Sequence, residues 1–255
     1  MPTISVVTIC YNNFEDVKMT CASVDKQTAL PSEHWVINGS TTPEIAIWLE
    51  TQPQPSYRKW ANVTNQGIAG NFNQGIERAG AEYIHLLNSG DLYASEHVIK
   101  NVNSFLENNL KANWISGNII LHRAGRWVAI GKPFDKKQIY KGMRAISHPT
   151  WFVKKEVYDR LGLYKNYSIA MDYDMMCRIK EEPNAYLDYT ITKFDNTGVS
   201  SVKYLDSLKQ NIEVYESNFG YSIKSRLWQF RLKLLHLFLQ TWLGKKAFSL
   251  KMKLS

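Results

Sequence analysis

The chain of 255 residues is 44% hydrophobic and 21% charged, which is the composition of an ordinary globular protein, and its formal net charge is +8. Residues 222–255 contain eight of the 31 Lys and Arg residues and none of the 23 Asp and Glu residues, so residues 1–221 carry no net charge. A protein that binds nucleic acid through its charge needs a basic body or aromatic and basic RNA motifs. This body has neither, and we expect no nucleic-acid partner.

The cysteines and the N-terminal residues indicate the cellular compartment of the protein. Cys10, Cys21 and Cys177 lack the CxxC spacing of a zinc site and do not make a disulfide framework, which fits a reducing cytosol. Residues 1–5 carry no charged leader, and no apolar stretch approaches the roughly 20 residues that a spanning helix needs. We therefore expect a cytoplasmic protein that does not cross a membrane by itself.

Strands and helices are predicted to alternate over the first 91 residues. The apolar run 4–10 predicts a buried strand, and a helix follows from residue 14 with Val17, Cys21 and Val24 at helical spacing. Further strands are expected at 34–37, 58–63 and from 82 up to Asp91, with a helix at 43–51 and a glycine-bearing loop entering a helix at 66–76. This order is typical of βαβ units and predicts a mostly parallel sheet.

The second half of the chain has a less regular pattern. We expect helices at 98–109, 152–161 and 173–181, and strands at 114–120 and 185–192, with a hairpin at 123–127 and a closing segment at 198–201. The stretch 131–144 is basic and poorly periodic, which predicts a mobile loop.

Two acidic clusters stand out as candidate sites. The run Asn88-Ser89-Gly90-Asp91 ends an apolar strand, and ligands of open α/β sheets bind beyond the carboxyl ends of the strands. A carboxylate placed there can bind a metal and a diphosphate, although turn capping is an alternative role. The second cluster holds Asp172 and Asp174 and is preceded in the chain by Ser147-His148-Pro149. One cluster can bind a donor and the other can activate an acceptor.

Together these segments resemble the family 2 glycosyltransferases of the GT-A fold over residues 3 to 201, and most of all the members that build bacterial surface polysaccharides such as capsule, O-antigen and exopolysaccharide. The matching pieces are the strand and turn 5–12, the strand end 37–41, the loop and helix 67–76, the run 88–91, the segment 147–152, Asp172-Tyr173-Asp174 with Arg178, and 198–200. The resemblance implies an α/β, Rossmann-like fold with a mostly parallel sheet flanked by helices. Residues 1–221 would form the GT-A domain, with a nucleotide-sugar half at about 1–95 and an acceptor half at about 96–221.

The resemblance also implies a donor site for a nucleoside-diphosphate sugar, with a UDP-sugar favoured. Thr8 and Tyr11 would border the base, and Asn38 would contact the uridine at a position where the family usually has Asp. An amide can both donate and accept hydrogen bonds, so binding is preserved in principle. The other residues placed near the donor are Gln66, Gly67, Asn71 and Asn88.

The family's metal motif usually has two or three acids, and here Asp91 alone remains. A single carboxylate is a normal ligand for Mg²⁺ or Mn²⁺ when diphosphate oxygens and waters complete the octahedron. The expected cofactor is therefore Mn²⁺ or Mg²⁺, bound at Asp91 together with the donor.

In the resemblance, Asp172 aligns with the catalytic base of an inverting transferase. A sugar hydroxyl is a poor nucleophile, and a carboxylate within hydrogen-bond reach can accept its proton during single displacement. Asp174 instead matches an ion pair with Arg178 at i,i+4 on a helix. His148 lies in a segment expected to face the acceptor, where it can bind a hydroxyl or the diphosphate, or serve as a satisfied core residue.

Residues 222–255 are predicted to form a basic amphipathic helical tail. The apolar residues that fall at helical spacing are Ile223, Leu227, Phe230, Leu234, Phe238 and Trp242. Such a helix suits an anionic membrane interface, which would place the protein on the inner face of a bacterial inner membrane and make its saccharide acceptor lipid-linked. The alternative is a helix packed on the domain or across a homodimer.

One alternative function remains open from the residues, and another is disfavoured. A catalytically silent relative that binds sugar nucleotide as a regulatory or scaffold subunit would explain Asn38, the single acid at Asp91 and Met171, which replaces an acid often found before the base. A dinucleotide-dependent dehydrogenase is disfavoured because no GxGxxG follows the first strand. The leading hypothesis is a metal-dependent, inverting glycosyltransferase.

Overall fold

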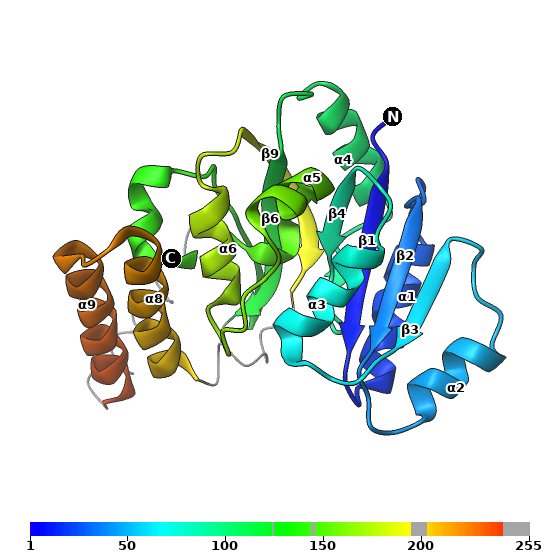
Figure 1. Ribbon diagram of the computed structural model, residues 1–255, viewed down its shortest axis with the longest axis horizontal. Helices are drawn as coiled ribbons and strands as arrows, with labels where there is room; N and C mark the ends of the chain where they lie inside the picture. The colour runs from blue at the N-terminus through cyan, green and yellow to red at the C-terminus, as the bar shows by residue number, and fades with distance from the viewer. Residues whose placement is uncertain (124, 144–145, 195–202, 242–255) are drawn as a thin grey trace.

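A computed structural model of the chain describes residues 1–123, 125–143, 146–194 and 203–241 (Figure 1). Within these ranges the strands form one nine-stranded sheet in the order β3-β2-β1-β4-β8-β6-β9-β5, and β7 pairs with the outer part of β6. The strands are β1 (Ile4–Cys10), β2 (Glu33–Asn38), β3 (Arg58–Asn62), β4 (Tyr83–Leu86), β5 (Leu92–Tyr93), β6 (Trp114–Arg123), β7 (Arg126–Ile130), β8 (Phe152–Lys154) and β9 (Asn184–Lys193).

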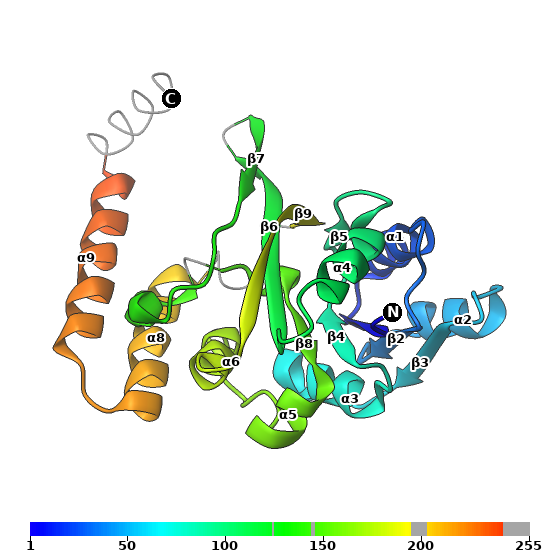
Figure 2. The ribbon, with the colours of Figure 1, turned by 90° about the horizontal axis from the view of Figure 1, so that it is seen from above.

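Helices cover the sheet on both faces, which confirms the predicted α/β class (Figures 1 and 2). They are α1 (Phe14–Asp25), α2 (Glu44–Thr51), α3 (Gly67–Arg78), α4 (Val98–Glu107), α5 (Lys155–Leu161), α6 (Met171–Ile179), α8 (Tyr204–Phe219) and α9 (Ile223–Gln240), with the 3₁₀ helices η1 (Lys136–Lys141) and η3 (His148–Thr150). The predicted elements of the first half, from β1 to β4, all form.

The first half of the sheet is parallel because βαβ crossovers connect its strands. β1 is buried along its whole length and pairs in parallel with β2 on one side and β4 on the other. The side chains of Val7 and Ile9 pack with α3 in one core cluster, whereas Cys10 packs with α1 and α2 in another. A Cβ atom at Gly75 would overlap Val7, so glycine allows α3 to approach the sheet closely.

The expectation of a mostly parallel sheet holds for β1 to β4 and not beyond. β8 is antiparallel to both β4 and β6, β5 is antiparallel to β9, and only β6 and β9 among the later described strands pair in parallel. Residues 152–154, predicted as the start of a helix, form β8 instead. Phe152 and Val153 are buried between β4 and β6, and this pairing between distant segments overrides the local helical pattern.

The basic stretch after β7 is also more ordered than predicted. It contains η1, whose Ile139 is buried, and Tyr173 of α6 donates a hydrogen bond of 2.6 Å to the carbonyl of Ile139. This segment is therefore packed against α6 rather than being a mobile loop. Strand β5 and helix α8 were not predicted, and residues 198–201, expected to close the core, lie outside the described residues.

The C-terminal part of the described chain is a hairpin of two helices, α8 and α9, at one end of the molecule (Figure 1). Helix α9 directs Ser225, Gln229 and Leu232 toward the body of the protein. Much of its apolar surface faces solvent, with Leu227 61% and Phe230 56% exposed. Nowhere in the described ranges does a helix combine the length and hydrophobicity that crossing a bilayer requires.

Candidate active site

A cavity of about 600 Å³ opens at the carboxyl ends of β1 and β4. It is lined by the ends of these two strands, by the start of α3, and by the segments around His148 and Asp172. The two acidic clusters singled out in the sequence therefore border one cavity although they are about 80 residues apart in the chain. Such a position is where ligands bind in open α/β sheets.

Seven of the ten predicted site residues line this cavity. They are Tyr11, Gly67, Asn71, Asn88, Asp91, His148 and Asp172. The three that do not line it are Thr8, Asn38 and Gln66, and each has another position in the fold.

Thr8 and Asn38 make internal hydrogen bonds. Thr8 is buried, and its hydroxyl is 2.9 Å from Nε2 of His34 on the neighbouring strand β2. The amide nitrogen of Asn38 donates to Asn62 Oδ1 at 2.8 Å, and its oxygen accepts from the backbone of Ser40 at 3.1 Å. Neither side chain lines the cavity, and each is hydrogen-bonded within the fold, so their role at the base stays a prediction.

The loop before α3 is held in place by asparagine side chains. Asn71 accepts a hydrogen bond from the backbone of Gln66 at 3.2 Å and donates to Asn65 at 3.0 Å. Asn65 in turn accepts from the backbone of Gly67 at 2.9 Å. Gln66 thus contributes its backbone to the loop, while Gly67 and Asn71 face the cavity at the N-terminal end of a 12-residue helix. A helix N-terminus favours anions such as a diphosphate.

The turn after β4 places Asp91 at the cavity. Thr20 of α1 accepts from the backbone of Gly90 at 3.0 Å and donates to the carbonyl of Asp91 at 2.9 Å, which anchors the turn to α1. On the other side of the turn, Asn13 donates to the hydroxyl of Ser89 at 2.8 Å. Asp91 is 3% exposed and lines the cavity beside Asn88.

The donor set at this turn fits a hard divalent cation. Asp91 supplies a carboxylate, and the neighbouring side chains of Asn88 and Ser89 supply neutral oxygens, which are the ligands that Mg²⁺ and Mn²⁺ prefer. Across the residues that the structure describes, no group of three or more His, Cys, Asp and Glu could bind a metal by itself.

Asp172 lies on the first turn of α6 beside His148. Its Oδ2 is 3.9 Å from His148 Nδ1, while its Oδ1 is inaccessible to solvent and has no hydrogen-bond partner among the described residues. Burial raises the pKa of the Asp172 carboxyl, an effect that the neighbouring His148 opposes. Burial likewise lowers the pKa of His148, so the ring is neutral at pH 7. The cavity therefore contains a carboxylate that lacks a strong partner and binds a proton more readily than an exposed one.

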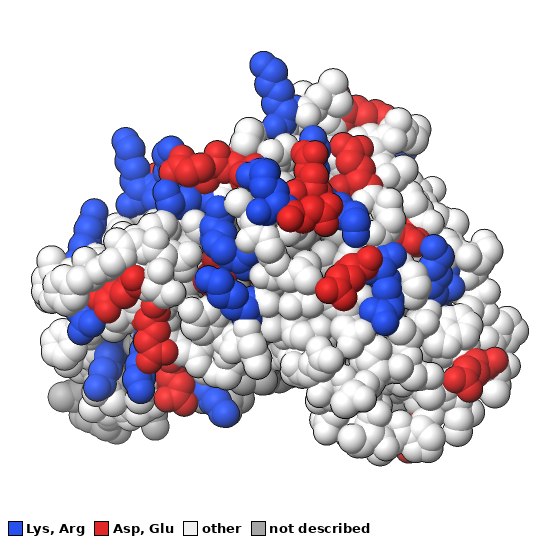
Figure 3. Space-filling view, viewed as in Figure 1, with Lys and Arg blue, Asp and Glu red and all other residues white. Residues whose placement is uncertain are grey.

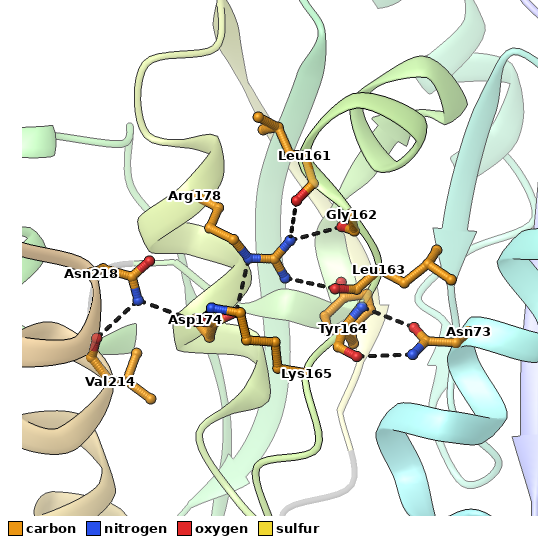
Figure 4. Close-up of polar contacts among 10 residues, drawn as sticks. All are labelled: Asn73, Leu161, Gly162, Leu163, Tyr164, Lys165, Asp174, Arg178, Val214 and Asn218. Atoms are coloured by element: carbon orange, nitrogen blue, oxygen red, sulfur yellow. Dashed lines mark hydrogen bonds and ion pairs between the residues drawn. The ribbon is translucent and has the colours of Figure 1, made fainter.

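The sequence did not identify the residues that orient His148. Tyr164 is hydrogen-bonded through its hydroxyl to His148 Nε2 at 2.8 Å. Asn73 of α3 binds both backbone groups of Tyr164, donating at 2.8 Å and accepting at 2.9 Å (Figure 4). Asn73 is one of several polar residues of α3, so nothing in the sequence pointed to its partner 91 residues away.

A second set of contacts fixes the backbone next to His148. His85 of β4 and Thr192 of β9 both donate to the carbonyl of Pro149, at 2.9 and 2.6 Å. The other ring nitrogen of His85 is 2.9 Å from the hydroxyl of Tyr93. Burial lowers the pKa of His85 to about 4, so the ring is neutral and Nδ1 accepts from Tyr93. These bonds position the segment that carries His148.

Asp174 does not line the cavity, and its carboxylate pairs with Arg178 at i,i+4 as expected (Figure 4). Its carboxylate is buried and accepts hydrogen bonds from Arg178 at 2.8 Å, from Lys165 at 3.2 Å and from Asn218 of α8 at 3.1 Å. Arg178 also donates to the carbonyls of three consecutive residues, 161–163. Asp174 therefore connects α6 with α8 and with the loop after α5.

Basic and acidic side chains are interspersed on the face of the molecule shown in Figure 3. Lys and Arg do not form a continuous patch on that face, and neighbouring Asp and Glu side chains lie among them. On this face the charges of both signs are mixed, in keeping with the balance of 23 basic and 23 acidic residues outside residues 222–255.

Comparisons with known proteins identify the fold and the family of the chain. Structures that share the fold include S. aureus TarS 1–349 in complex with UDP-GlcNAc, with a TM-score of 0.62, 12% identity and coverage of 89% of this chain and 70% of that chain. Another is the mannosyltransferase PcManGT from Pyrobaculum calidifontis in complex with GDP-Man and Mn²⁺, with a TM-score of 0.62, 13% identity and coverage of 99% and 80%. At this identity the likeness shows a common GT-A fold.

In sequence, the chain is similar to an uncharacterized glycosyltransferase of Mycobacterium tuberculosis, MT1564 in strain CDC 1551 and Rv1514c in strain H37Rv. Identity to each is 25% over 205 residues, which covers 78% of this chain and 78% of the relative. The family model described as glycosyl transferase family 2 matches residues 5–162, a range that includes β1, the turn at Asp91 and His148. The chain belongs to glycosyl transferase family 2.

Proposed function

We propose that this protein is an inverting glycosyltransferase that moves a sugar from a nucleoside-diphosphate sugar to a hydroxyl group of a saccharide, with Asp172 as the general base. The observation that carries the proposal is the carboxylate of Asp172, which lines the cavity beside His148 with its side chain 30% exposed. Its Oδ2 lies 3.9 Å from His148 Nδ1, beyond hydrogen-bond distance, so this carboxylate can accept a hydrogen bond from an acceptor hydroxyl. Because burial raises the pKa of Asp172, its carboxylate accepts a proton more readily than an exposed one.

The proposed reaction is a single displacement. The acceptor hydroxyl transfers its proton to Asp172 while its oxygen bonds to the anomeric carbon of the donor. The bond between that carbon and the diphosphate oxygen breaks on the opposite face, and the nucleoside diphosphate departs with the electron pair. Attack from the face opposite the leaving group inverts the anomeric configuration. His148, held by Tyr164, orients the carboxylate from its other side.

The donor would occupy the part of the cavity between Tyr11, Gly67 and Asp91. The start of α3 faces this part and favours the diphosphate. Mn²⁺ or Mg²⁺, when bound by Asp91 and diphosphate oxygens, would neutralise charge on the departing diphosphate. TarS with UDP-GlcNAc and PcManGT with GDP-Man and Mn²⁺ share the fold and support a nucleotide-sugar donor. We favour a UDP-sugar.

The test uses the full chain with a panel of UDP-, GDP-, CDP- and dTDP-sugars, with Mn²⁺, Mg²⁺ or EDTA, measuring release of the nucleoside diphosphate. Asp172→Asn should keep donor binding and lose about 10²- to 10⁴-fold in rate. Asp159→Asn, an exposed acid on α5, is the matched control and should not change the rate. Donor binding without turnover in the wild type would instead indicate a catalytically silent, regulatory relative.

We also propose that α9 and the basic residues after it bind an anionic membrane surface, and that the acceptor is lipid-linked. The exposed apolar side chains of α9 are Ile223, Leu227, Phe230, Leu234, Leu235, Leu237 and Phe238. Basic side chains at Lys224, Arg231 and Lys233 also face solvent. This combination suits the interface of an anionic leaflet, as on the inner face of a bacterial inner membrane where surface polysaccharides are built.

Vesicle binding separates this proposal from packing against a protein partner. The full chain should co-sediment with phosphatidylglycerol vesicles at low salt. Less should co-sediment at high salt, because each basic residue near the surface contributes about 1 kcal/mol of electrostatic binding free energy, which salt screens. Phe230→Glu with Leu234→Glu should abolish this binding without lowering the melting temperature, since both side chains are about half exposed. Leu110→Glu, on an exposed leucine between α4 and β6, is the control. A stable dimer that ignores vesicles would contradict the membrane proposal.

A further inference from the structure

A second cavity of about 330 Å³ adjoins the candidate active site. It lies between α6, η1 and the α8/α9 hairpin, and Met143, Ile169 and Asp172 line both cavities. Its volume falls within the range of about 300–1,000 Å³ that is usual for small-molecule sites. Asp172, the proposed base, therefore borders both the cavity proposed for the donor and this second cavity.

The lining of the second cavity combines aromatic, apolar and polar side chains. Tyr204 of α8 lies at its edge, with its ring packed on His236 of α9 at a centroid distance of 4.8 Å. Ser207 and Asn211 follow on the same helix at helical spacing and also face the cavity. Leu232 of α9 and Ile169 complete its apolar wall. Aromatic faces beside hydroxyl and amide groups match a saccharide, whose ring has both an apolar face and hydroxyls.

Asn211 is the most informative of these residues. It is half-buried, and none of the hydrogen bonds found among the described residues uses its side-chain amide. Gly142 lies directly beneath it at a φ of +80°, and a Cβ atom there would be 2.9 Å from Asn211 Nδ2. Glycine at 142 thus leaves the amide free to face the cavity, where it can both donate to and accept from a ligand hydroxyl.

We infer that this second cavity binds the saccharide acceptor. The inference rests on the proposed function, since a hydroxyl deprotonated by Asp172 must lie about 2.6–3.2 Å from its carboxylate. With the donor in the first cavity, the remainder of the acceptor has space in the second. Tyr204, Ser207, Asn211 and Leu232 all lie outside residues 5–162, the range that the family model matches. Acceptor choice would then depend on the C-terminal helices of this chain.

The experiment measures binding of simple saccharides to the full chain saturated with UDP and Mn²⁺. The probes are p-nitrophenyl glycosides of common hexoses and hexosamines, tested by saturation-transfer NMR and then by calorimetry. At least one glycoside should bind the wild type, and Asn211→Leu and Tyr204→Ala should each weaken it by 10-fold or more. Neither variant should change the affinity for UDP, because neither residue lines the first cavity.

Lys209→Leu is the matched control, because it places the same side chain on an exposed position of α8. Melting curves check that all variants fold, and Asn211→Asp, of equal size, provides a second test that should also weaken binding. The inference would be wrong if the variants bound the glycoside as tightly as the wild type, or if the wild type bound UDP but no glycoside. Either result would leave the proposed function standing. A wild type that binds no nucleoside diphosphate would instead overturn the proposed function.

Discussion

Replacing Asp174 by alanine tests whether the second acid of the Asp-Tyr-Asp run is structural. Its carboxylate is completely buried and accepts from Arg178, Lys165 and Asn218, and it lines neither cavity (Figure 4). Asp174→Ala removes the acceptor for all three donors. We expect lower stability and unchanged donor binding in the folded protein.

The size of the loss follows from the surroundings of each donor. Breaking a buried ion pair by removing one partner costs about 3–5 kcal/mol. Lys165 is 50% exposed, so its share is that of a surface ion pair, about 0–1 kcal/mol. Arg178 is 12% exposed but keeps three carbonyl acceptors, which places the loss at the lower end, about 3 kcal/mol. For a chain of this size the melting temperature would fall by about 6–12 °C.

Thermal unfolding followed by circular dichroism measures this change, with Asp159→Ala on the surface of α5 as the control. UDP binding, measured below the transition, should match the wild type. A decrease of less than about 2 °C would refute the account of the Asp174 contacts. Wild-type stability with loss of sugar transfer would place Asp174 in the catalytic machinery instead.

Three other predictions concern the site. Asp91→Ala should remove the gain in UDP affinity that Mn²⁺ provides, and an unchanged gain in a calorimetric titration would move the metal site elsewhere. Asp172 must be ionised to accept a proton, and burial raises its pKa, so the transfer rate should fall as the pH drops through a pKa higher than that of an ordinary aspartate. A pH–rate profile whose acid limb has the pKa of an ordinary aspartate would contradict this. His85→Phe should cost about 1–3 kcal/mol by urea unfolding, because the hydroxyl of Tyr93 loses its acceptor and the carbonyl of Pro149 one of two donors. An unchanged urea midpoint would show that these bonds do not position the segment.

The sequence predicts the first half of the fold well because its signals are local. A seven-residue apolar run gives β1, helical spacing gives α1, and a polar turn after β4 places Asp91 at a strand end. The segments that fail depend on distant partners. β8 has three residues and forms a strand only between β4 and β6, which no pattern within 152–161 indicates.

The same limit applies to the site residues. Asp91, His148 and Asp172, which the motifs singled out, line one cavity because strand ends and helix starts gather at the same edge of the sheet. They do not tell which side chains near such an edge reach the cavity. Thr8 falls in a matching motif and shares a face of β1 with Cys10, which lines the cavity, yet Thr8 lies two residues further into the strand. Its hydroxyl is 2.9 Å from Nε2 of His34, a partner 26 residues later that no local motif indicates.

The environment of Asp172 bears on whether the protein is an enzyme or a silent relative. A buried acceptor without a partner destabilises a fold by about 1–3 kcal/mol. A scaffold that only bound sugar nucleotide would be more stable with a partner for this oxygen, and Tyr164 already occupies the far side of His148. A catalyst can tolerate this cost, because the raised pKa that burial gives the Asp172 carboxyl favours proton transfer from the acceptor hydroxyl. Asp172→Asn should therefore fold at least as stably as the wild type while losing transfer. A large loss of stability would indicate that Asp172 is a structural residue.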